Sequence, residues 1–124
     1  MLRVSILMIS STGELGGGPN LMFLLGNKLN KKIDIYYAIP KTKNYRNILN
    51  SHNHIDIKER KLSFEDIIRI ILFIKKNSIN LIHAHGKGAN LISRIIKLFV
   101  GIPIIYTYHG IHLKCHNKLN NLIY

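Results

Sequence analysis

The segment from Asn80 to His112 restricts the fold of this chain more than any other part of the sequence. It begins with a short apolar run over Asn80–Ala84 and continues with apolar residues at helical spacing over Ala89–Val100. A second apolar run over Pro103–Tyr108 closes it. This succession predicts a strand–helix–strand unit, and strands joined by such a crossover are parallel. The segment therefore predicts an α/β domain.

Each predicted strand of this unit ends at a turn that contains a histidine. His85-Gly86 follows the first strand and His109-Gly110 follows the second. Because parallel strands point the same way, both turns emerge at the same edge of the sheet. Open α/β sheets bind their ligands in the crevice at the carboxyl ends of the strands. We therefore expect both turns to face one ligand-binding crevice.

The rest of the chain repeats the alternation of apolar strands and amphipathic helices. The predicted elements are strands over Leu2–Ile9, Ile33–Ile39 and Ile55–Ile57, and helices over Pro19–Asn30, Tyr45–Ser51 and Phe64–Asn77, the last capped by Ser63. Such alternation favours a Rossmann-like, doubly wound parallel sheet. A chain of 124 residues suits a single domain of this kind, spanning residues 1–124.

Cysteine content and hydropathy indicate a cytoplasmic domain. Cys115 is the only cysteine, which excludes an internal disulfide and suits a reducing compartment. The apolar run Ile67–Ile74 is interrupted by Arg69 and is shorter than the roughly 20 residues that a membrane-spanning helix needs. The N-terminal run MLRVSILMIS lacks a small-residue cleavage site, so we expect a first strand instead of a signal peptide.

The chain is strongly basic, with 18 Lys and Arg residues against 6 Asp and Glu residues and a formal net charge of +12. Such an excess favours a polyanionic neighbour, such as nucleic acid, anionic lipid headgroups or phosphorylated substrates. The basic residues form no compact stripe and few aromatic residues lie among them, so nucleic acid is not the expected partner. A compositional bias of the coding DNA explains the excess equally well, because Ile, Asn and Lys are all abundant.

A glycine-rich loop follows the first predicted strand and contains Gly13, Gly16, Gly17 and Gly18. Glycines let the backbone approach a ligand closely, and the following helix offers unpaired N–H groups and a positive dipole end. A phosphate or diphosphate is the natural ligand. The loop is not a nucleotide-binding P-loop, because no Gly-Lys-Ser/Thr follows, and the second strand ends without the acidic residue that a nicotinamide ribose requires. A purely structural tight turn remains the alternative.

The remaining histidines give little support for a metal site. His109, His112, Cys115 and His116 have a spacing that suggests zinc. No second ligand pair stands at zinc-finger spacing and the acidic residues of a metal hydrolase are missing, so we expect neither a metal nor another cofactor. His83 alternates with Leu81 along its strand and is expected to be a hydrogen-bonded core histidine that faces a helical layer.

The chain resembles the N-terminal half of family 4 glycosyltransferases, which have the GT-B architecture. The segments that carry the resemblance are ELGGGPNLMFLLGNKL, NLIHAHGKGANLISRIIKLFVGIPIIYTYHGIHL and the spacing between them. The pairing of HAHG with GIPIIYTYHGIH is most similar to members that build capsule, O-antigen or other lipid-linked polysaccharides. The resemblance implies two facing Rossmann-like domains, a nucleotide-diphospho-sugar bound between them, and transfer that retains the anomeric configuration without a metal.

The resemblance also implies roles for individual residues. Gly17 and Gly18 would lie against the donor diphosphate, and His109 would be the catalytic residue beside the donor sugar. The residues at the acceptor side of the cleft would be His85, Gly86 and Gly110. The implied ligands are a nucleotide-sugar donor and a lipid-linked glycan acceptor, and the positive charge suits peripheral contact with an anionic membrane.

The sequence departs from the family in one large respect, because the nucleotide-gripping C-terminal domain with its paired glutamates is missing. We therefore expect a truncated N-terminal domain that is inactive alone and that a separate C-terminal half would complement. The alternative is a non-enzymatic, basic α/β module that binds nucleotides or other polyanions.

Overall fold

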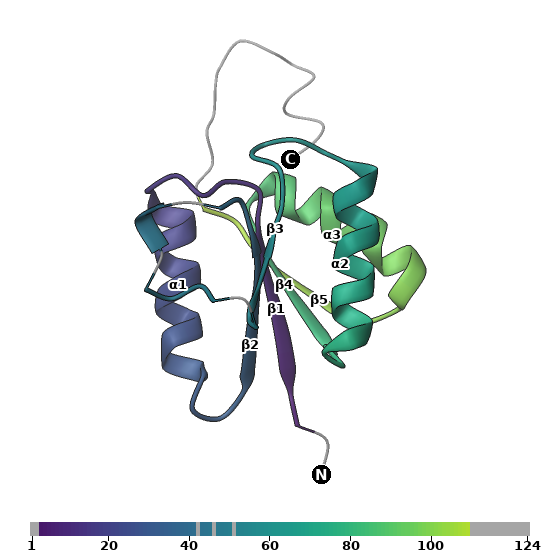
Figure 1. Ribbon diagram of the computed structural model, residues 1–124, viewed down its shortest axis with the longest axis horizontal. Coiled ribbons are helices and arrows are strands. Elements are labelled where there is room, and N and C mark those ends of the chain that lie inside the picture. Colours follow the sequence, from purple (N-terminus) through teal and green to yellow (C-terminus); the bar gives the residue numbers. More distant parts are fainter. Residues whose placement is uncertain (1–2, 42, 46, 51, 110–124) are drawn as a thin grey trace.

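The structure, a computed structural model, describes residues 3–41, 43–45, 47–50 and 52–109 (Figure 1). Its strands are β1 Ser5–Ser10, β2 Asp34–Ile39, β3 His54–Asp56, β4 Leu81–His85 and β5 Ile104–Thr107. Its helices are α1 Gly17–Leu29, α2 Phe64–Lys76 and α3 Lys87–Val100, with a 3₁₀ turn, η1, over Lys43–Tyr45. All strand pairs are parallel and the strand order is β3-β2-β1-β4-β5, which confirms the predicted doubly wound sheet.

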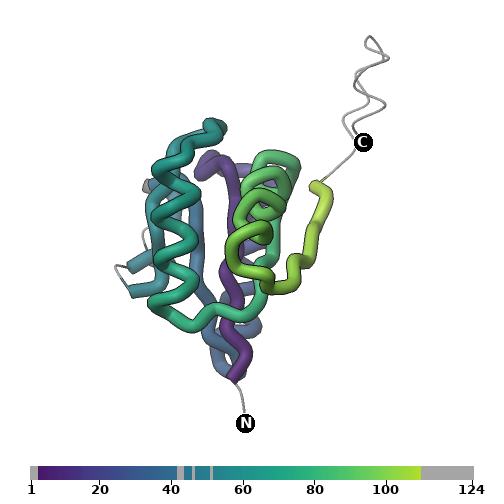
Figure 2. The backbone as a smooth tube through the Cα atoms, turned by 90° about the vertical axis from the view of Figure 1, so that its right-hand side faces the viewer, coloured from purple at the N-terminus to yellow at the C-terminus, as the bar shows by residue number. Residues whose placement is uncertain are grey.

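The sheet lies between two helical layers. Helix α1 covers one face, whereas α2 and α3 lie side by side on the other (Figures 1 and 2). The strand order reverses between β1 and β4, because the chain passes from β3 at one edge to β4 on the far side of β1. Ligand crevices of open α/β sheets lie at this reversal point, outside the carboxyl ends of the strands. The fold therefore places the glycine loop after β1 beside the end of β4.

The central strand β1 is buried on both faces. Leu7 and Ile9 belong to the core under α2 and α3, and Ile6 and Met8 belong to a smaller core under α1. A strand covered on both sides reads as a continuous apolar run instead of an alternating pattern, as SILMIS does. The apolar run at the N-terminus thus marks the middle of the sheet.

The predicted helix over Tyr45–Ser51 is wrong. Among the described residues of this region, Lys43–Tyr45 form a 3₁₀ turn, and a hydrogen-bonded turn at residues 47–48 takes the place of an α-helix. The side-chain carbonyl of Asn50 accepts hydrogen bonds from the amides of His52 and Asn53, at 2.8 and 3.0 Å. Such local side-chain hydrogen bonds compete with helix formation, and this is the physical reason for the difference.

The other predicted elements form with shifted ends, and two shifts affect the site. Helix α1 begins at Gly17, earlier than the predicted Pro19, so its first turn contains the glycines. Strand β4 extends to His85, which lies inside the strand and not beyond it. Ser63 occupies the N-cap position of α2 but makes no capping hydrogen bond; its hydroxyl accepts one from Lys58 Nζ at 3.3 Å.

Candidate functional site

A crevice at the carboxyl edge of the sheet contains the residues that the sequence singled out. It has a volume of about 290 Å³ and lies among the β1–α1 loop, the first turn of α1 and the ends of β4 and β5. The predicted residues that line it are Gly17, Gly18, His85, Gly86 and His109. Gly110 lies outside the described residues. The two histidine turns and the glycine loop therefore face one crevice, as predicted.

The start of α1 presents free backbone donors to this crevice. Gly16 is the N-cap and Asn20 donates the first helical hydrogen bond, from its amide to the Gly16 carbonyl at 3.1 Å. The amides of Gly17 and Gly18 precede that bond, so they have no acceptor within the helix. In the described part of the chain, no atom beyond the neighbouring backbone lies within 4 Å of where a side chain on Gly16 or Gly17 would begin. An anion can approach these donors directly, and the helix dipole favours it.

Three histidines form a contiguous cluster at the crevice. His85 is 3% exposed, and its Nδ1 lies 3.1 Å from Nε2 of His109. The rings of His85 and His109 are nearly parallel, with centroids 5.3 Å apart. His85 also contacts His83, and the centroids of these two rings are 4.1 Å apart. His83 is hydrogen-bonded, as predicted, with its Nε2 2.7 Å from Thr107 Oγ1, although it is half-buried and not part of the core.

Burial keeps the inner histidines of the cluster neutral. Loss of solvent around His85, reinforced by His83 and His109, lowers its pKa from about 6.5 to about 3. Burial, followed by the effect of His109, also lowers the pKa of His83. These two imidazoles therefore carry no charge near neutral pH. Charge on these two histidines therefore does not stabilise a bound anion, whereas the backbone amides and the dipole of α1 are suited to do so.

Gly18 brings α1 into contact with the histidine cluster. A Cβ atom at Gly18 would lie 3.3 Å from Cδ2 of His109, which is closer than ordinary van der Waals contact. The absence of a side chain thus allows the His109 ring to pack directly on the first turn of α1. The donor amides and the histidine are adjacent because of this close approach.

Comparison with known proteins identifies the family. The model of Glycosyltransferase Family 4 matches residues 15–123. This chain belongs to glycosyltransferase family 4. The crystal structure of MurG from Acinetobacter baumannii is similar, with a TM-score of 0.65 and 13% sequence identity, over 86% of this chain and 35% of that one. The chain thus spans about a third of the length of MurG. No curated protein sequence matches it.

These matches confirm the resemblance to family 4 and the Rossmann-like domain of a GT-B glycosyltransferase. The likeness to MurG concerns the fold, since the sequence identity is low. The family match includes the glycine turn at Gly16–Gly18 and the histidines at the ends of β4 and β5.

A second loop of this glycosyltransferase domain holds the glycine loop in place, and the sequence analysis did not find it. The amide of Arg60 donates to the Ser11 carbonyl at 2.7 Å, and the amide of Gly13 donates to Glu59 Oε2 at 3.0 Å. The Arg60 guanidinium pairs with Glu14 Oε2 at 2.8 Å. Arg60 has a φ of 47°, a left-handed conformation that a non-glycine residue rarely adopts. The sequence holds only a slight signal for this contact, namely an acidic residue, Glu14, within the glycine loop of a basic chain.

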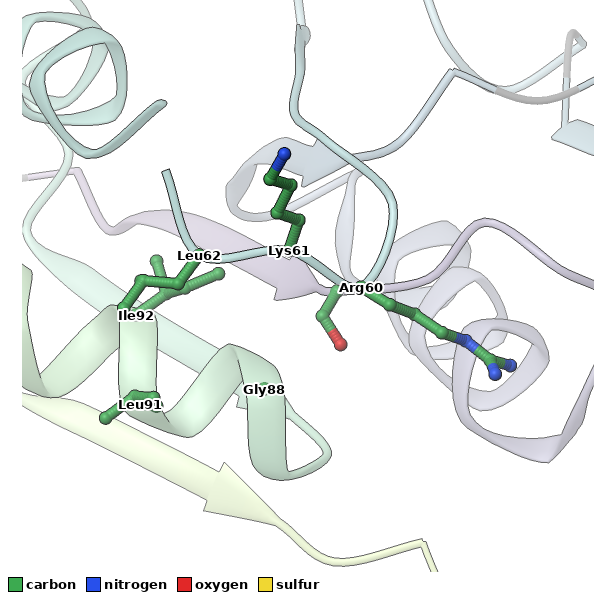
Figure 3. A pocket seen from close by; sticks show the side chains of 7 residues that line it. Arg60, Lys61, Leu62, Gly88, Leu91 and Ile92 are labelled. Atoms are coloured by element: carbon green, nitrogen blue, oxygen red, sulfur yellow. The ribbon is translucent and has the colours of Figure 1, made fainter. Parts of the chain in front are cut away.

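A second cavity adjoins the crevice and extends it toward α3. It has a volume of about 380 Å³ and shares Ser11 and Arg60 with the crevice. Leu62 and Ile92 both line this cavity, and the side chains of Arg60 and Lys61 point in different directions (Figure 3). The polar crevice of this family 4 domain is thus continued by a partly apolar surface.

The structure offers no metal site within the described residues. No group of three or more His, Cys, Asp or Glu side chains in that part of the chain is arranged to hold an ion. Of the residues with zinc-like spacing, His112, Cys115 and His116 lie outside the described range. That the protein uses neither a metal nor another cofactor stays a prediction.

Proposed function

We propose that this chain is the acceptor-side, N-terminal part of a retaining glycosyltransferase. The enzyme would transfer a hexosyl or N-acetylhexosaminyl group from a nucleotide-diphospho-sugar to a lipid-linked or polysaccharide acceptor, in the synthesis of capsule, lipopolysaccharide or another cell-envelope glycan. One observation supports this proposal most: the free amides of Gly17 and Gly18 face the same crevice as the His85–His109 pair.

The chemistry of glycosyl transfer suits this arrangement. The reaction releases a diphosphate, and preorganised amides at a helix N-terminus stabilise its negative charge. His109 lies against the amide-bearing turn, so it can hydrogen-bond the sugar or phosphate and orient the donor. Glu14 also borders the crevice, but its carboxylate is paired with Arg60. The mechanism we propose therefore uses His109 and does not use Glu14.

The donor site can be tested on the chain itself by titrating a UDP-sugar into ¹⁵N-labelled protein. Binding is expected to shift the amide resonances of Gly17 and Gly18 and to be weakened by His109→Ala. His52→Ala, a change at an exposed turn, is the matched control and should bind as the wild type does. Shifts that avoid the glycine turn, or equal binding by His109→Ala, would contradict the proposed site.

The nucleotide-gripping half is proposed to lie outside these 124 residues. This chain corresponds to 35% of MurG, and the resemblance assigns the nucleotide-binding residues to the C-terminal domain. We expect the 124-residue protein to bind a donor weakly and not to turn it over. Hydrolysis or transfer of a UDP-sugar by the purified chain would refute this part of the proposal.

Contact with an anionic membrane on the cytoplasmic side is proposed for the helical layer of α2 and α3. Among the described residues no helix is long and apolar enough to cross a membrane. The outer surface of the layer nevertheless carries exposed apolar side chains, including Phe64, Leu72 and Leu98, beside the basic residues Lys76 and Lys97. Apolar and basic side chains on one helical surface suit peripheral binding to acidic lipids.

Vesicle co-sedimentation tests the membrane contact. Binding is expected to vesicles that contain phosphatidylglycerol and not to pure phosphatidylcholine vesicles, and Leu98→Glu should weaken it. Equal binding by Leu98→Glu would remove this surface from the proposal.

The net charge of +12 favours the second candidate function, a non-enzymatic module that binds nucleic acid or another polyanion. Electrostatic binding of this kind falls steeply with salt concentration. Salt-dependent binding to nucleic acid, without any binding of nucleotide-sugars, would favour this function over the glycosyltransferase.

A further inference from the structure

The contact between His85 and His109 is the most closely defined polar contact of the crevice. Nδ1 of His85 and Nε2 of His109 are 3.1 Å apart, and the two rings lie within 14° of parallel. We propose that His85 is a positioning residue that fixes the tautomer and ring orientation of His109, which then offers an Nδ1–H donor to the ligand. This inference rests on the proposed function only for the identity of the ligand.

The environment of His85 decides which nitrogen carries the proton. Its Nε2 is buried and has no hydrogen-bond partner within the described residues. If Nε2 carried the proton, a buried N–H would be stranded, and such orphaned donors are rare because they lose the full hydrogen bond to water. If Nε2 is unprotonated, only an acceptor lone pair is left without a hydrogen bond. Nδ1 of His85 therefore carries the proton and donates it to Nε2 of His109.

This donation determines the state of His109. A neutral imidazole has one N–H and one acceptor nitrogen, and an Nε2 that accepts a hydrogen bond leaves the proton on Nδ1. The lowered pKa of His85 supports this assignment, because a neutral His85 has a single proton to donate. His109 can then donate from Nδ1 to an oxygen of the ligand, but its Nε2 is occupied and is not available as a base.

The ring orientation of His109 is fixed from two sides. Gly18 packs against its Cδ2 edge, and Nδ1 of His85 meets its Nε2 edge. His85 is in turn packed against His83, which is anchored by Thr107 of β5. Thr107 lies in β5 and His109 follows it, so the cluster starts and ends on the same segment of chain. A closed arrangement of this kind limits rotation of the His109 ring.

Long-range ¹H–¹⁵N correlation of the histidine rings tests the inference on the 124-residue protein without ligand, at mildly alkaline pH. In the wild type His109 is expected to be protonated on Nδ1 and not on Nε2. His85→Phe keeps a ring but removes the donor, so the excess of this tautomer should be lost. His85→Asn places an amide N–H near the position of Nδ1 and should restore it.

His83→Phe is the matched control, because it keeps a ring against His85 and does not touch the bond to His109. It should leave the tautomer of His109 unchanged. An Nε2–H tautomer in the wild type would overturn the proposal even if a variant failed to fold, and so would an unchanged tautomer in a folded His85→Phe. Subsequent addition of a UDP-sugar separates the two proposals. If the tautomer is as expected but the His109 ring signals do not respond, the donor site fails and the positioning role stands.

Discussion

The two faces of the sheet are built differently although the same strands form both. Ile82 and Ala84 of β4 point into the hydrophobic core under α2 and α3, where both are 0% exposed. The alternate residues His83 and His85 point to the α1 face and join His109 in a polar cluster. Ile105, the neighbour of His83 on β5, is 49% exposed on this face. One face therefore carries the main apolar core, and the other carries the candidate chemistry.

Shortening a side chain on either face of β4 should show which face stabilises the fold, and the larger loss of unfolding free energy is expected on the apolar face. Ile82→Ala is expected to lower the free energy of unfolding by about 2–5 kcal/mol, because a fully buried side chain leaves a cavity. His83→Ala removes one hydrogen bond and should cost only about 1 kcal/mol. Urea denaturation of both variants measures the difference. Equal losses of unfolding free energy in the two variants would contradict the proposed difference between the two faces.

Acid should destabilise the histidine face. The pKa of His85 is about 3 in the folded state against about 6.5 when unfolded, so the unfolded chain binds the proton first as the pH falls. The contribution of neutral His85 to the free energy of unfolding is therefore fully present above pH 6.5 and decreases below it. For one such group the decrease is about 2 kcal/mol between pH 7 and pH 5. His83, whose pKa is also lowered, acts in the same direction.

Unfolding free energies at several pH values measure this loss. His85→Phe is expected to reduce the pH dependence, whereas Ile82→Ala should lower stability equally at every pH. An unchanged pH dependence in His85→Phe would show that His85 is not buried and neutral.

The packing of α1 against the histidines can be tested at Gly18. Its substitution by Ala places a methyl group 3.3 Å from His109 Cδ2 and should displace the ring. Donor affinity is expected to fall about tenfold, equivalent to about 1.4 kcal/mol. The new methyl group of Gly17→Ala meets no other described segment within 4 Å, so this variant should leave the ring signals of His109 unchanged. Displacement of His109 in both variants would contradict the specific contact at Gly18.

The smallest effect is expected at the ion pair between the loops. Arg60 and Glu14 are about two-thirds exposed, at 66% and 67% of their side chains, and exposed ion pairs contribute about 0.2–1 kcal/mol. Glu14→Gln should therefore change the midpoint of thermal unfolding only slightly. Glu65→Gln, at a longer exposed contact of 3.8 Å to Lys58, is the control. A large decrease of the unfolding midpoint in Glu14→Gln, but not in Glu65→Gln, would show that the ion pair at the glycine loop stabilises the fold more than expected.

Much of this arrangement could be predicted from the sequence, because it depends on local patterns. Apolar runs and helical spacing predicted the parallel sheet, and histidines at successive strand ends predicted that His85 and His109 share an edge. The ends of elements were less predictable, since Asn50 used its side chain to form a turn where a helix was expected. Such side-chain hydrogen bonds are compatible with several local patterns and are decided by the surrounding chain.

The sequence by itself determined the α/β class, the family, and the edge of the sheet at which the site lies. These properties follow from the periodicity of apolar residues and from short motifs, both of which are read along the chain. The tertiary structure alone decided that Arg60 and Glu59 hold the glycine loop and that Gly18 touches His109. It also decided that His85 is buried between two other histidines. These features depend on distances and solvent exclusion between segments far apart in sequence, and only packing determines them.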